Sequence, residues 1–147
     1  WFEGDKYYAD ALPREHIERE TPILMDTKRW LDVYFTGREP DFTPPLHPTG
    51  STFRMTIWRL LLQIPYGQTT TYGELAKRLE SGRMSAQAVG GAVGHNPISI
   101  IVPCHRVVGA NGSLTGYAGG LDRKIRLLEI EQTDMHGLFR PKKGTAI

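Results

Sequence analysis

The sequence has a single cysteine, and it has no long run of apolar residues. One cysteine cannot form a disulfide within the chain or a multi-cysteine zinc cluster, so Cys104 is either a small buried residue or a reactive centre. No apolar run approaches the ~20 residues of a membrane span, and nothing resembles a signal peptide. We therefore expect no membrane partner and a reducing compartment, either the cytoplasm or, in a eukaryote, the nucleus.

The charges divide the 147 residues into two unequal parts. Residues 1–48 carry six Lys/Arg and ten Asp/Glu, and residues 49–147 carry twelve and six, so the balances of −4 and +6 add to +2. Three prolines and a glycine between Thr43 and Gly50 separate these parts as a linker does. The pattern predicts two modules, with the basic one facing a polyanion, although ordinary variation in composition also accounts for it.

The acidic first part predicts one helix. Thr21 and Pro22 have the chemistry of an N-cap followed by proline at the first helical position, and Gly37 ends the segment. About one helical face is apolar, namely Leu24, Trp30, Leu31, Tyr34 and Phe35. We expect this helix to be structural and to pack against a strand ending near Phe2. The apolar start at Trp1 leads us to expect further sequence upstream.

The basic second part predicts a helix over residues 51–64 and then two short helices in succession. Thr71 and Glu74 have capping-box spacing and open a helix that runs to about Glu80. Residues 85–94, which are rich in small side chains, form the next helix. Two short helices around a glycine-containing turn are typical of a helix-turn-helix.

Three glycines, Gly90, Gly91 and Gly94, lie inside the second of these short helices. Each glycine costs a helix up to ~1 kcal/mol relative to alanine, so a close approach must offset the loss. Tight packing of another protein segment and the approach of a nucleic-acid backbone both satisfy this need. The sequence does not decide between the two.

Cys104 follows an apolar segment. Residues 98–102 predict a short buried strand, and Pro103 ends it because proline cannot donate to a sheet. His105 is adjacent to the thiol, and a neighbouring imidazole is a common means of favouring a thiolate. After a flexible loop at 116–120, we expect Asp122 to cap a last helix.

Five motifs occur together in a characteristic order. They are Thr71–Ala76 (TYGELA), Val89–Ala92 (VGGA), Asn96-Pro97, Pro103–Val107 (PCHRV) and Gly116–Gly120 (GYAGG). Over residues 50–131, and weakly over the first 48, the sequence resembles the O6-alkylguanine-DNA alkyltransferases, or methylated-DNA–protein-cysteine methyltransferases. The resemblance implies an α+β fold, in which residues 1–48 belong to a truncated small α/β N-terminal domain. It also implies that residues 49–147 form a catalytic, winged-helix-like helix-turn-helix domain.

The resemblance implies direct-reversal DNA repair. An alkyl group passes from O6 of guanine, or O4 of thymine, in double-stranded DNA to the protein's own cysteine, and the transfer is stoichiometric because the thioether is not regenerated. Cys104 is the implied nucleophile, and His105 is the base acting through a bridging water. Glu131 orients and polarises His105, and Asn96 holds the turn around the site. Adjacent strand residues point to opposite faces, which agrees with a water relay. We expect a monomer without a cofactor.

The target nucleotide has to leave the duplex, because a buried thiol cannot approach O6 of a stacked guanine. The resemblance implies that Tyr72 crowds a phosphate and drives this rotation, and that Tyr117 and the glycines after it line the pocket; a core tyrosine and a turn tyrosine are the alternatives. The implied groove is the minor one. The positions expected at DNA or at the flipped base are Tyr72, Arg83, Gln87, Gly90, Gly91, Arg106, Tyr117, Ala118 and Gly119.

Two positions depart from the family's pattern. Many members carry an arginine in the recognition helix where this chain has Gln87, which lacks the charge and stacking area of a guanidinium. Arg83, about one turn earlier, is our candidate for the missing cation. Ala118 stands where some relatives have a hydroxyl, so activation of the leaving group is expected to rest on backbone N–H groups. Some relatives bind zinc through N-terminal cysteines; this chain has none there, so we predict no zinc.

Three other function classes remain. An alkyltransferase-like sensor binds lesions without repair, but such proteins lack the reactive cysteine. A helix-turn-helix transcription regulator binds DNA without catalysing a reaction, and its Pro-Cys-His-Arg segment would only pack in the core. A cysteine hydrolase uses Cys104 and His105 with turnover, whereas an alkyl acceptor is exhausted after one equivalent.

Overall fold

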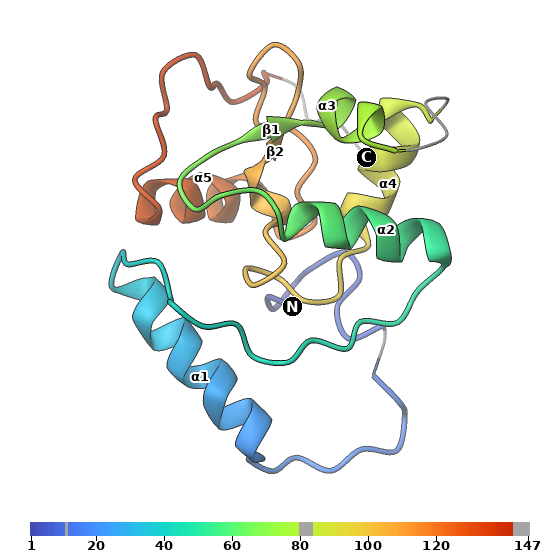
Figure 1. Ribbon diagram of the computed structural model, residues 1–147, viewed down its shortest axis with the longest axis vertical. Helices are drawn as coiled ribbons and strands as arrows, with labels where there is room; N and C mark the ends of the chain where they lie inside the picture. Colours follow the sequence, from blue (N-terminus) through green and yellow to red (C-terminus); the bar gives the residue numbers. More distant parts are fainter. Residues whose placement is uncertain (11, 80–83, 143–147) are drawn as a thin grey trace.

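The computed structural model describes residues 1–10, 12–79 and 84–142 and is a helix-rich, mixed fold with a small sheet (Figure 1). Its helices are α1 (Pro22–Phe35), α2 (Thr52–Leu61), α3 (Tyr72–Lys77), α4 (Ala86–Gly94) and α5 (Leu121–Ile130), with a 3₁₀ turn, η1, at Cys104–Arg106. The strands β1 (Thr70–Thr71) and β2 (Val107–Val108) pair in parallel, with Thr70 opposite Val107. In the described residues, no helix combines the length and apolar character that crossing a membrane requires.

Side-chain caps begin four of these helices. The hydroxyl oxygen of each cap accepts a hydrogen bond from a backbone N–H three residues on, which otherwise has no partner in the helix. The caps and their distances are Thr21 to Leu24 (3.4 Å), Ser51 to Arg54 (3.3 Å), Thr71 to Glu74 (3.1 Å) and Ser85 to Ala88 (3.1 Å). These starts match the expected helices, although α3 ends earlier than expected, at Lys77.

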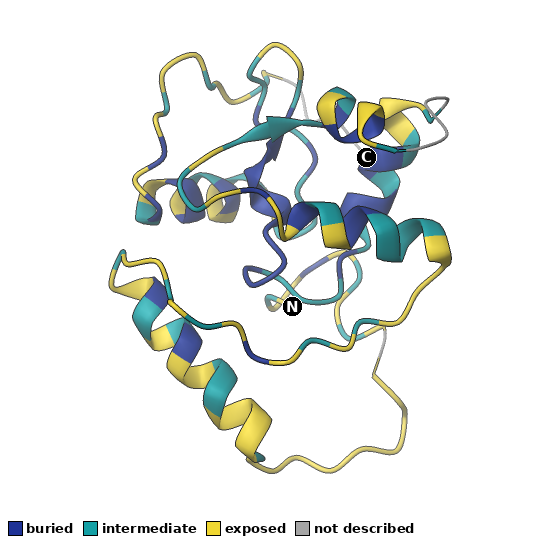
Figure 2. Ribbon diagram, viewed as in Figure 1, coloured by how far each residue is buried: buried dark blue, intermediate teal, exposed yellow. Residues whose placement is uncertain are grey.

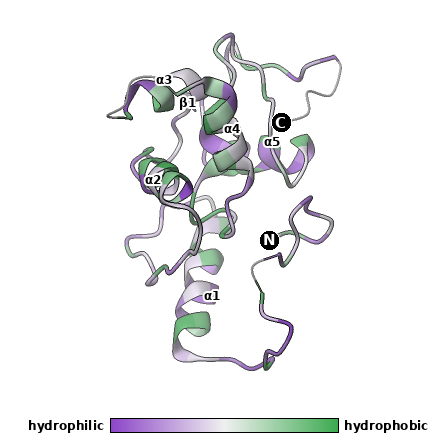
Figure 3. Cartoon of the chain, turned by 90° about the vertical axis from the view of Figure 1, so that its right-hand side faces the viewer, coloured by the Kyte–Doolittle hydropathy of each residue, from purple (hydrophilic) through white to green (hydrophobic). Residues whose placement is uncertain are grey.

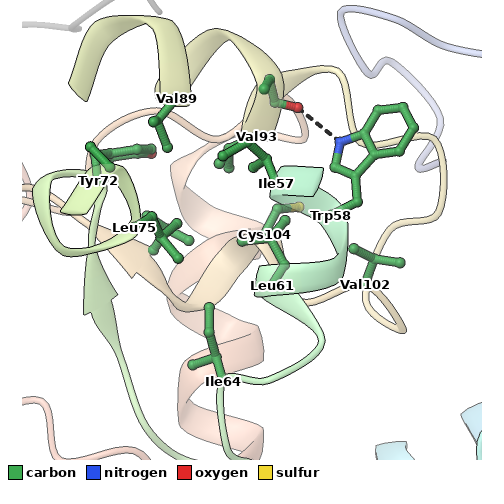
Figure 4. Packing of buried hydrophobic residues seen from close by; sticks show 13 residues of the cluster. Ile57, Trp58, Leu61, Ile64, Tyr72, Leu75, Val89, Val93, Val102 and Cys104 are labelled. Carbon is green, nitrogen blue, oxygen red and sulfur yellow. Dashed lines mark hydrogen bonds between the residues drawn. The ribbon is translucent and has the colours of Figure 1, made fainter. Parts of the chain in front are cut away.

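The main core lies between α2 and the helix pair α3–α4 (Figure 4). Trp58 fixes α2 to α4 because its indole N–H donates to the Ala92 carbonyl at 2.9 Å. Cys104 belongs to one buried cluster with apolar side chains from all three helices; among them are Ile57, Leu61, Leu75, Val89 and Val93. The cysteine therefore lies against a packed apolar wall.

α1 packs its inner face against the segment before η1. Trp30 and Tyr34, one turn apart, are buried with Ile100, Ile101 and Leu127 in a second cluster. The outer face is exposed (Figure 2), and in the side view of Figure 3 the helix carries both hydrophobic and hydrophilic turns. The first part of the chain thus contributes to the interior of the second.

The expected strand at residues 98–102 is wrong. This segment turns back on itself: the Val102 N–H donates to the Ile98 carbonyl at 3.2 Å, and Ile100 has φ +71°. The Asn96 side chain bonds the backbone at both ends of the turn, so the segment needs no neighbouring strand. Ile100, Ile101 and Val102 of this segment are buried, as expected, but in a turn.

Two smaller expectations also differ. Residues 1–10 form successive turns rather than a strand ending near Phe2. The last helix begins after Gly120, whose φ is +88°, and no side chain caps it; Asp122 lies in its first turn and pairs with Arg140. A positive φ suits glycine, which explains why the chain enters α5 there without a polar cap.

Candidate active site

The sulfur of Cys104 is held by Asn96. The Asn96 Nδ2 group donates to Sγ at 3.1 Å and to the Val102 carbonyl at 2.8 Å, while its Oδ1 accepts from the Ile98 N–H at 3.0 Å. Cys104 is 6% exposed. Burial raises the pKa of the Cys104 thiol, and the hydrogen bond from Asn96 opposes this effect only in part. The group is therefore a thiol at neutral pH and needs a base to become a nucleophile.

His105 and Glu131 form a buried pair beside the cysteine. Their Nε2 and Oε1 atoms are 2.6 Å apart, and the two residues are 0% and 2% exposed. A carboxylate only accepts, so Nε2 carries the hydrogen and the neutral ring keeps Nδ1 as an acceptor. Nδ1 is buried and has no hydrogen-bond partner among the described residues. Burial lowers the pKa of His105 against the pull of Glu131, which favours this neutral form.

The position of Cys104 and His105 on the 3₁₀ turn η1 replaces the strand geometry that we expected. The sulfur bonds to Asn96, whereas the ring bonds to Glu131 at the end of α5. The two side chains therefore have separate partners because each forms its own hydrogen bond from a 3₁₀ turn, and not because neighbouring side chains of a strand point to opposite faces.

Arg106 is buried and pairs with Glu131, and its expected contact with DNA stays a prediction. Its Nε and Nη2 atoms donate to the two carboxylate oxygens of Glu131 at 2.8 and 3.0 Å, and Nη1 donates to the Ile64 carbonyl at 2.6 Å. The residue is 8% exposed. This bidentate pair compensates the negative charge of the buried carboxylate. The guanidinium is therefore directed inward and away from the surface.

Glu131 is the most heavily hydrogen-bonded acid of the site. Besides His105 and Arg106, the Tyr34 hydroxyl donates to Oε1 at 2.8 Å and the Gly67 N–H donates to Oε2 at 3.2 Å. Burial alone raises the pKa of Glu131, but the bonds from His105 and Arg106 outweigh it and hold the pKa at about 2. The carboxylate is thus a fixed negative charge facing the imidazole.

Lys124 and Tyr72 hold the loop that follows β2. The Lys124 ammonium is fully buried and donates to the Val107 and Thr115 carbonyls at 2.5 and 2.7 Å; burial lowers its pKa to about 8. The Tyr72 hydroxyl donates to the Thr115 and Gly116 carbonyls, each at 3.2 Å. Tyr72 therefore points toward this loop, and its contact with a phosphate stays a prediction.

The loop at 116–119 and Cys104 line the same small pocket. Tyr117, Ala118 and Gly119 are among its lining residues, and their contact with a flipped base stays a prediction. A Cβ on Gly119 meets the Tyr117 ring at 2.9 Å, which explains the glycine. Three residues from the first ten of the chain, Trp1, Asp5 and Tyr7, also line it, and the Tyr7 ring stacks on His95 with centroids 4.0 Å apart.

α4 presents the remaining expected DNA positions. Gln87 is exposed in its first turn, and Gly90 is buried. A Cβ added to Gly91 or Gly94 meets no protein atom within 4 Å outside the helix backbone, so packing within the chain does not require these two glycines. Arg83 lies outside the described residues.

Two residues of the site were not predicted from the sequence. Tyr34 gave no signal beyond its place on an apolar helical face, since Glu131 is 97 residues away. Lys124 gave a weak signal, because it shares a helical face with Leu127, Leu128 and Glu131. In the described part of the chain, no three His, Cys, Asp or Glu side chains converge as metal ligands, and the absence of zinc stays a prediction.

Comparisons with known proteins agree on one family. The model of the "6-O-methylguanine DNA methyltransferase, DNA binding domain" matches residues 52–133. A methylated-DNA–protein-cysteine methyltransferase of Methanosarcina mazei is 44% identical over 124 residues, which are 84% of this chain and 77% of the relative. The corresponding Haemophilus influenzae protein is 43% identical over 132 residues, covering 89% and 72%.

A solved structure gives the same result. The crystal structure of Mycobacterium tuberculosis OGT in complex with DNA is 44% identical, with a TM-score of 0.74 over 87% of this chain and 81% of that one. The family model spans more than half of the sequence, and the relatives are covered over more than two thirds of their length. The chain therefore belongs to the methylated-DNA–protein-cysteine methyltransferase family.

Proposed function

We propose that this chain repairs alkylated DNA by transferring one alkyl group from O6 of a guanine, flipped out of the duplex, to Cys104. The observation that carries the proposal is the position of the thiol. Cys104 lines a pocket together with the loop at 116–119, its sulfur accepts a hydrogen bond from Asn96, and the His105–Glu131 pair begins at the next residue. A protonated, buried thiol with a base in the next residue is suited to one attack on a carbon delivered into the pocket.

The proposed reaction conserves atoms and charge. The Cys104 thiol gives its proton through one water to Nδ1 of His105, and Sγ forms a bond to the alkyl carbon. The bond from that carbon to O6 breaks and its electron pair stays with the purine, which takes up one proton from water while His105 releases the proton that it received. The products are a thioether and an ordinary guanine, so each chain acts once.

The role of Glu131 in this relay is electrostatic. Because its carboxylate accepts the hydrogen on Nε2, the ring keeps Nδ1 as the proton acceptor, and the negative charge stabilises the imidazolium that forms. The unpaired, buried Nδ1 supports this direction of proton transfer.

The DNA is proposed to approach along α4. Gly91 and Gly94 leave room beside the helix that no protein atom fills, which supports a close approach of the sugar–phosphate backbone. Tyr117 and Gly119 are proposed to receive the flipped base. Since Ala118 has no hydroxyl, charge on O6 has to be met by backbone N–H groups of this loop. O4-alkylthymine is proposed as a second substrate of the same pocket.

Single-turnover transfer from an O6-methylguanine duplex tests the relay. His105→Gln and Glu131→Gln are expected to slow the limiting rate by about 10²-fold or more, since general-base catalysis contributes that much. His136→Gln and Glu129→Gln alter exposed residues of the same types and serve as controls. Wild-type rates in both relay variants contradict the relay. Loss of binding without loss of the limiting rate assigns these residues to DNA contact instead.

A further inference from the structure

Tyr34 connects the first part of the chain to the proposed relay. It is fully buried on α1, and its hydroxyl donates to Oε1 of Glu131 at 2.8 Å. The hydroxyl oxygen also lies 3.5 Å from Nε2 of His105. Its ring is stacked on Trp30 with centroids 5.2 Å apart, which fixes the direction of the hydroxyl. Burial raises the pKa of Tyr34, so the hydroxyl stays a donor throughout the working pH range.

We propose that Tyr34 is a positioning residue for the alkyl transfer, because its hydroxyl shares Oε1 of Glu131 with the imidazole of His105 and so limits how strongly that carboxylate attracts a proton to the ring. This inference rests on the proposed His105–Glu131 relay. The helix that the sequence predicts to be structural thereby acts on the chemistry. Tyr34 touches neither substrate nor sulfur, and it acts only through Glu131.

The contact geometry gives the effect a sign. The hydroxyl and His105 share Oε1, so the tyrosine takes part of the negative charge that otherwise faces the imidazole. Without the hydroxyl, Glu131 attracts a proton on His105 more strongly. The pKa of His105 then rises, and less of the neutral base is present at a given acid pH.

The groups around the imidazole determine how far its pKa can be altered by one substitution. The charged and titratable groups that face it are Glu131 and Lys124 from α5 and its end, Arg106 from its own turn, and Tyr34 from α1. Arg106 and Lys124 lower the pKa of His105, and Glu131 raises it. Replacing Tyr34 by phenylalanine leaves all three charges in place and removes one oxygen.

The test compares Tyr34→Phe with Tyr66→Phe. Tyr66 contacts the Tyr34 ring edge to face, but its hydroxyl donates to the Ile130 carbonyl at 3.4 Å and not to Glu131. The limiting rate of transfer from an O6-methylguanine duplex is measured from pH 5.5 to 9, together with the DNA concentration for half-saturation. Thermal unfolding is followed in parallel.

For Tyr34→Phe, we expect the acid limb of the rate profile to move up by about one pH unit. The transfer then becomes about tenfold slower at the acid end and changes little at pH 9. The DNA concentration for half-saturation of Tyr34→Phe is expected to stay at the wild-type value. The pH profile of Tyr66→Phe is expected to match that of the wild type. A superimposable Tyr34→Phe profile, or a loss that is equal at every pH and follows a loss of folded protein, overturns the inference.

A third variant separates this inference from the relay beneath it. His105→Gln is measured in the same series. If it reacts at the wild-type rate, the proposed relay is wrong, and the inference about Tyr34 fails with it. If His105→Gln is slow while Tyr34→Phe keeps the wild-type profile, only the inference about Tyr34 fails.

Discussion

At Cys104, two local effects oppose each other. Burial against α2 and α4 raises the pKa of the thiol, and the hydrogen bond from Asn96 lowers it by a smaller amount. A cysteine in this setting is not reactive on its own, unlike one whose pKa is depressed by a nearby cation. Its reactivity depends on a proton acceptor next to it, which is why the orientation of His105 matters more than the exposure of the sulfur.

Arg83 and Gln87, which are expected at the site that the flipped base leaves, give a prediction at the scale of single residues. If Arg83 supplies the cation that Gln87 lacks, Arg83→Ala slows transfer from duplex DNA by about tenfold, the value of roughly one polar contact. Gln87→Arg in that background restores the rate, because Gln87 is exposed at the start of α4. Single-turnover kinetics on duplex DNA measure both variants.

Arg59→Ala is the control for these variants, since it removes the same charge from an exposed position on α2. The assignment to Arg83 is wrong if Arg83→Ala repairs the duplex as fast as the wild type while Gln87→Ala does not.

At the scale of the elements, α4 carries a prediction about its glycines. Gly91→Ala places a methyl group where no protein atom lies within 4 Å, so the free energy of unfolding is expected to stay the same or rise by up to ~1 kcal/mol. Duplex affinity is expected to fall, because the methyl group meets the approaching DNA backbone. Chemical denaturation and a duplex titration measure the two effects.

The two measurements on Gly91→Ala distinguish a DNA contact from a packing contact at this glycine. Unchanged duplex affinity excludes close approach of DNA at this position. A loss of stability instead indicates a packing role for the glycine.

Helix starts could be predicted from the sequence because their signals are local. Thr21, Ser51, Thr71 and Ser85 each bond an N–H only three residues away, so the cap and the helix lie in one short window. The five motifs also located the cysteine, the histidine and the pocket loop. These features depend on residue type and spacing along the chain.

The features that the sequence did not reveal depend on contacts between distant segments. The turn at 98–102 has the apolar composition of a strand, and only the bonds of Asn96 to both its ends distinguish the two. Arg106 lies beside the nucleophile in sequence, yet its side chain is directed to Glu131, 25 residues later. Tyr34 meets the same carboxylate from α1. Nothing in a local window encodes where that acid lies.

At the scale of the whole molecule, the buried carboxylate makes stability depend on pH. The pKa of Glu131 is about 2 in the folded chain, against an ordinary value of 4.5. A depressed folded-state pKa adds stability above pH 4.5, and this contribution is lost as the pH falls toward 2. The difference corresponds to about 3 kcal/mol. Denaturant unfolding between pH 6 and 3 is therefore expected to show falling stability.

The dependence of the unfolding free energy on pH is tested with variants of an exposed and of a buried glutamate. Glu129→Gln, at an exposed position, is expected to keep the slope. The double variant Glu131→Gln/Arg106→Met removes both buried charges, so that neither is left unpaired, and is expected to flatten it. A double variant that retains the full slope contradicts the assignment to Glu131.

The central claim, that Cys104 is a single-use alkyl acceptor, is tested most directly by the mass of the peptide that contains it. The chain is incubated with excess duplex carrying O6-methylguanine and digested, and the peptide masses are measured by mass spectrometry. Cys104→Ser is the control. We predict that Cys104 gains one methyl group in place of its hydrogen, and that repair stops at one guanine per chain. DNA binding without this mass change, a methyl group on another residue, or repair beyond one guanine per chain contradicts the claim.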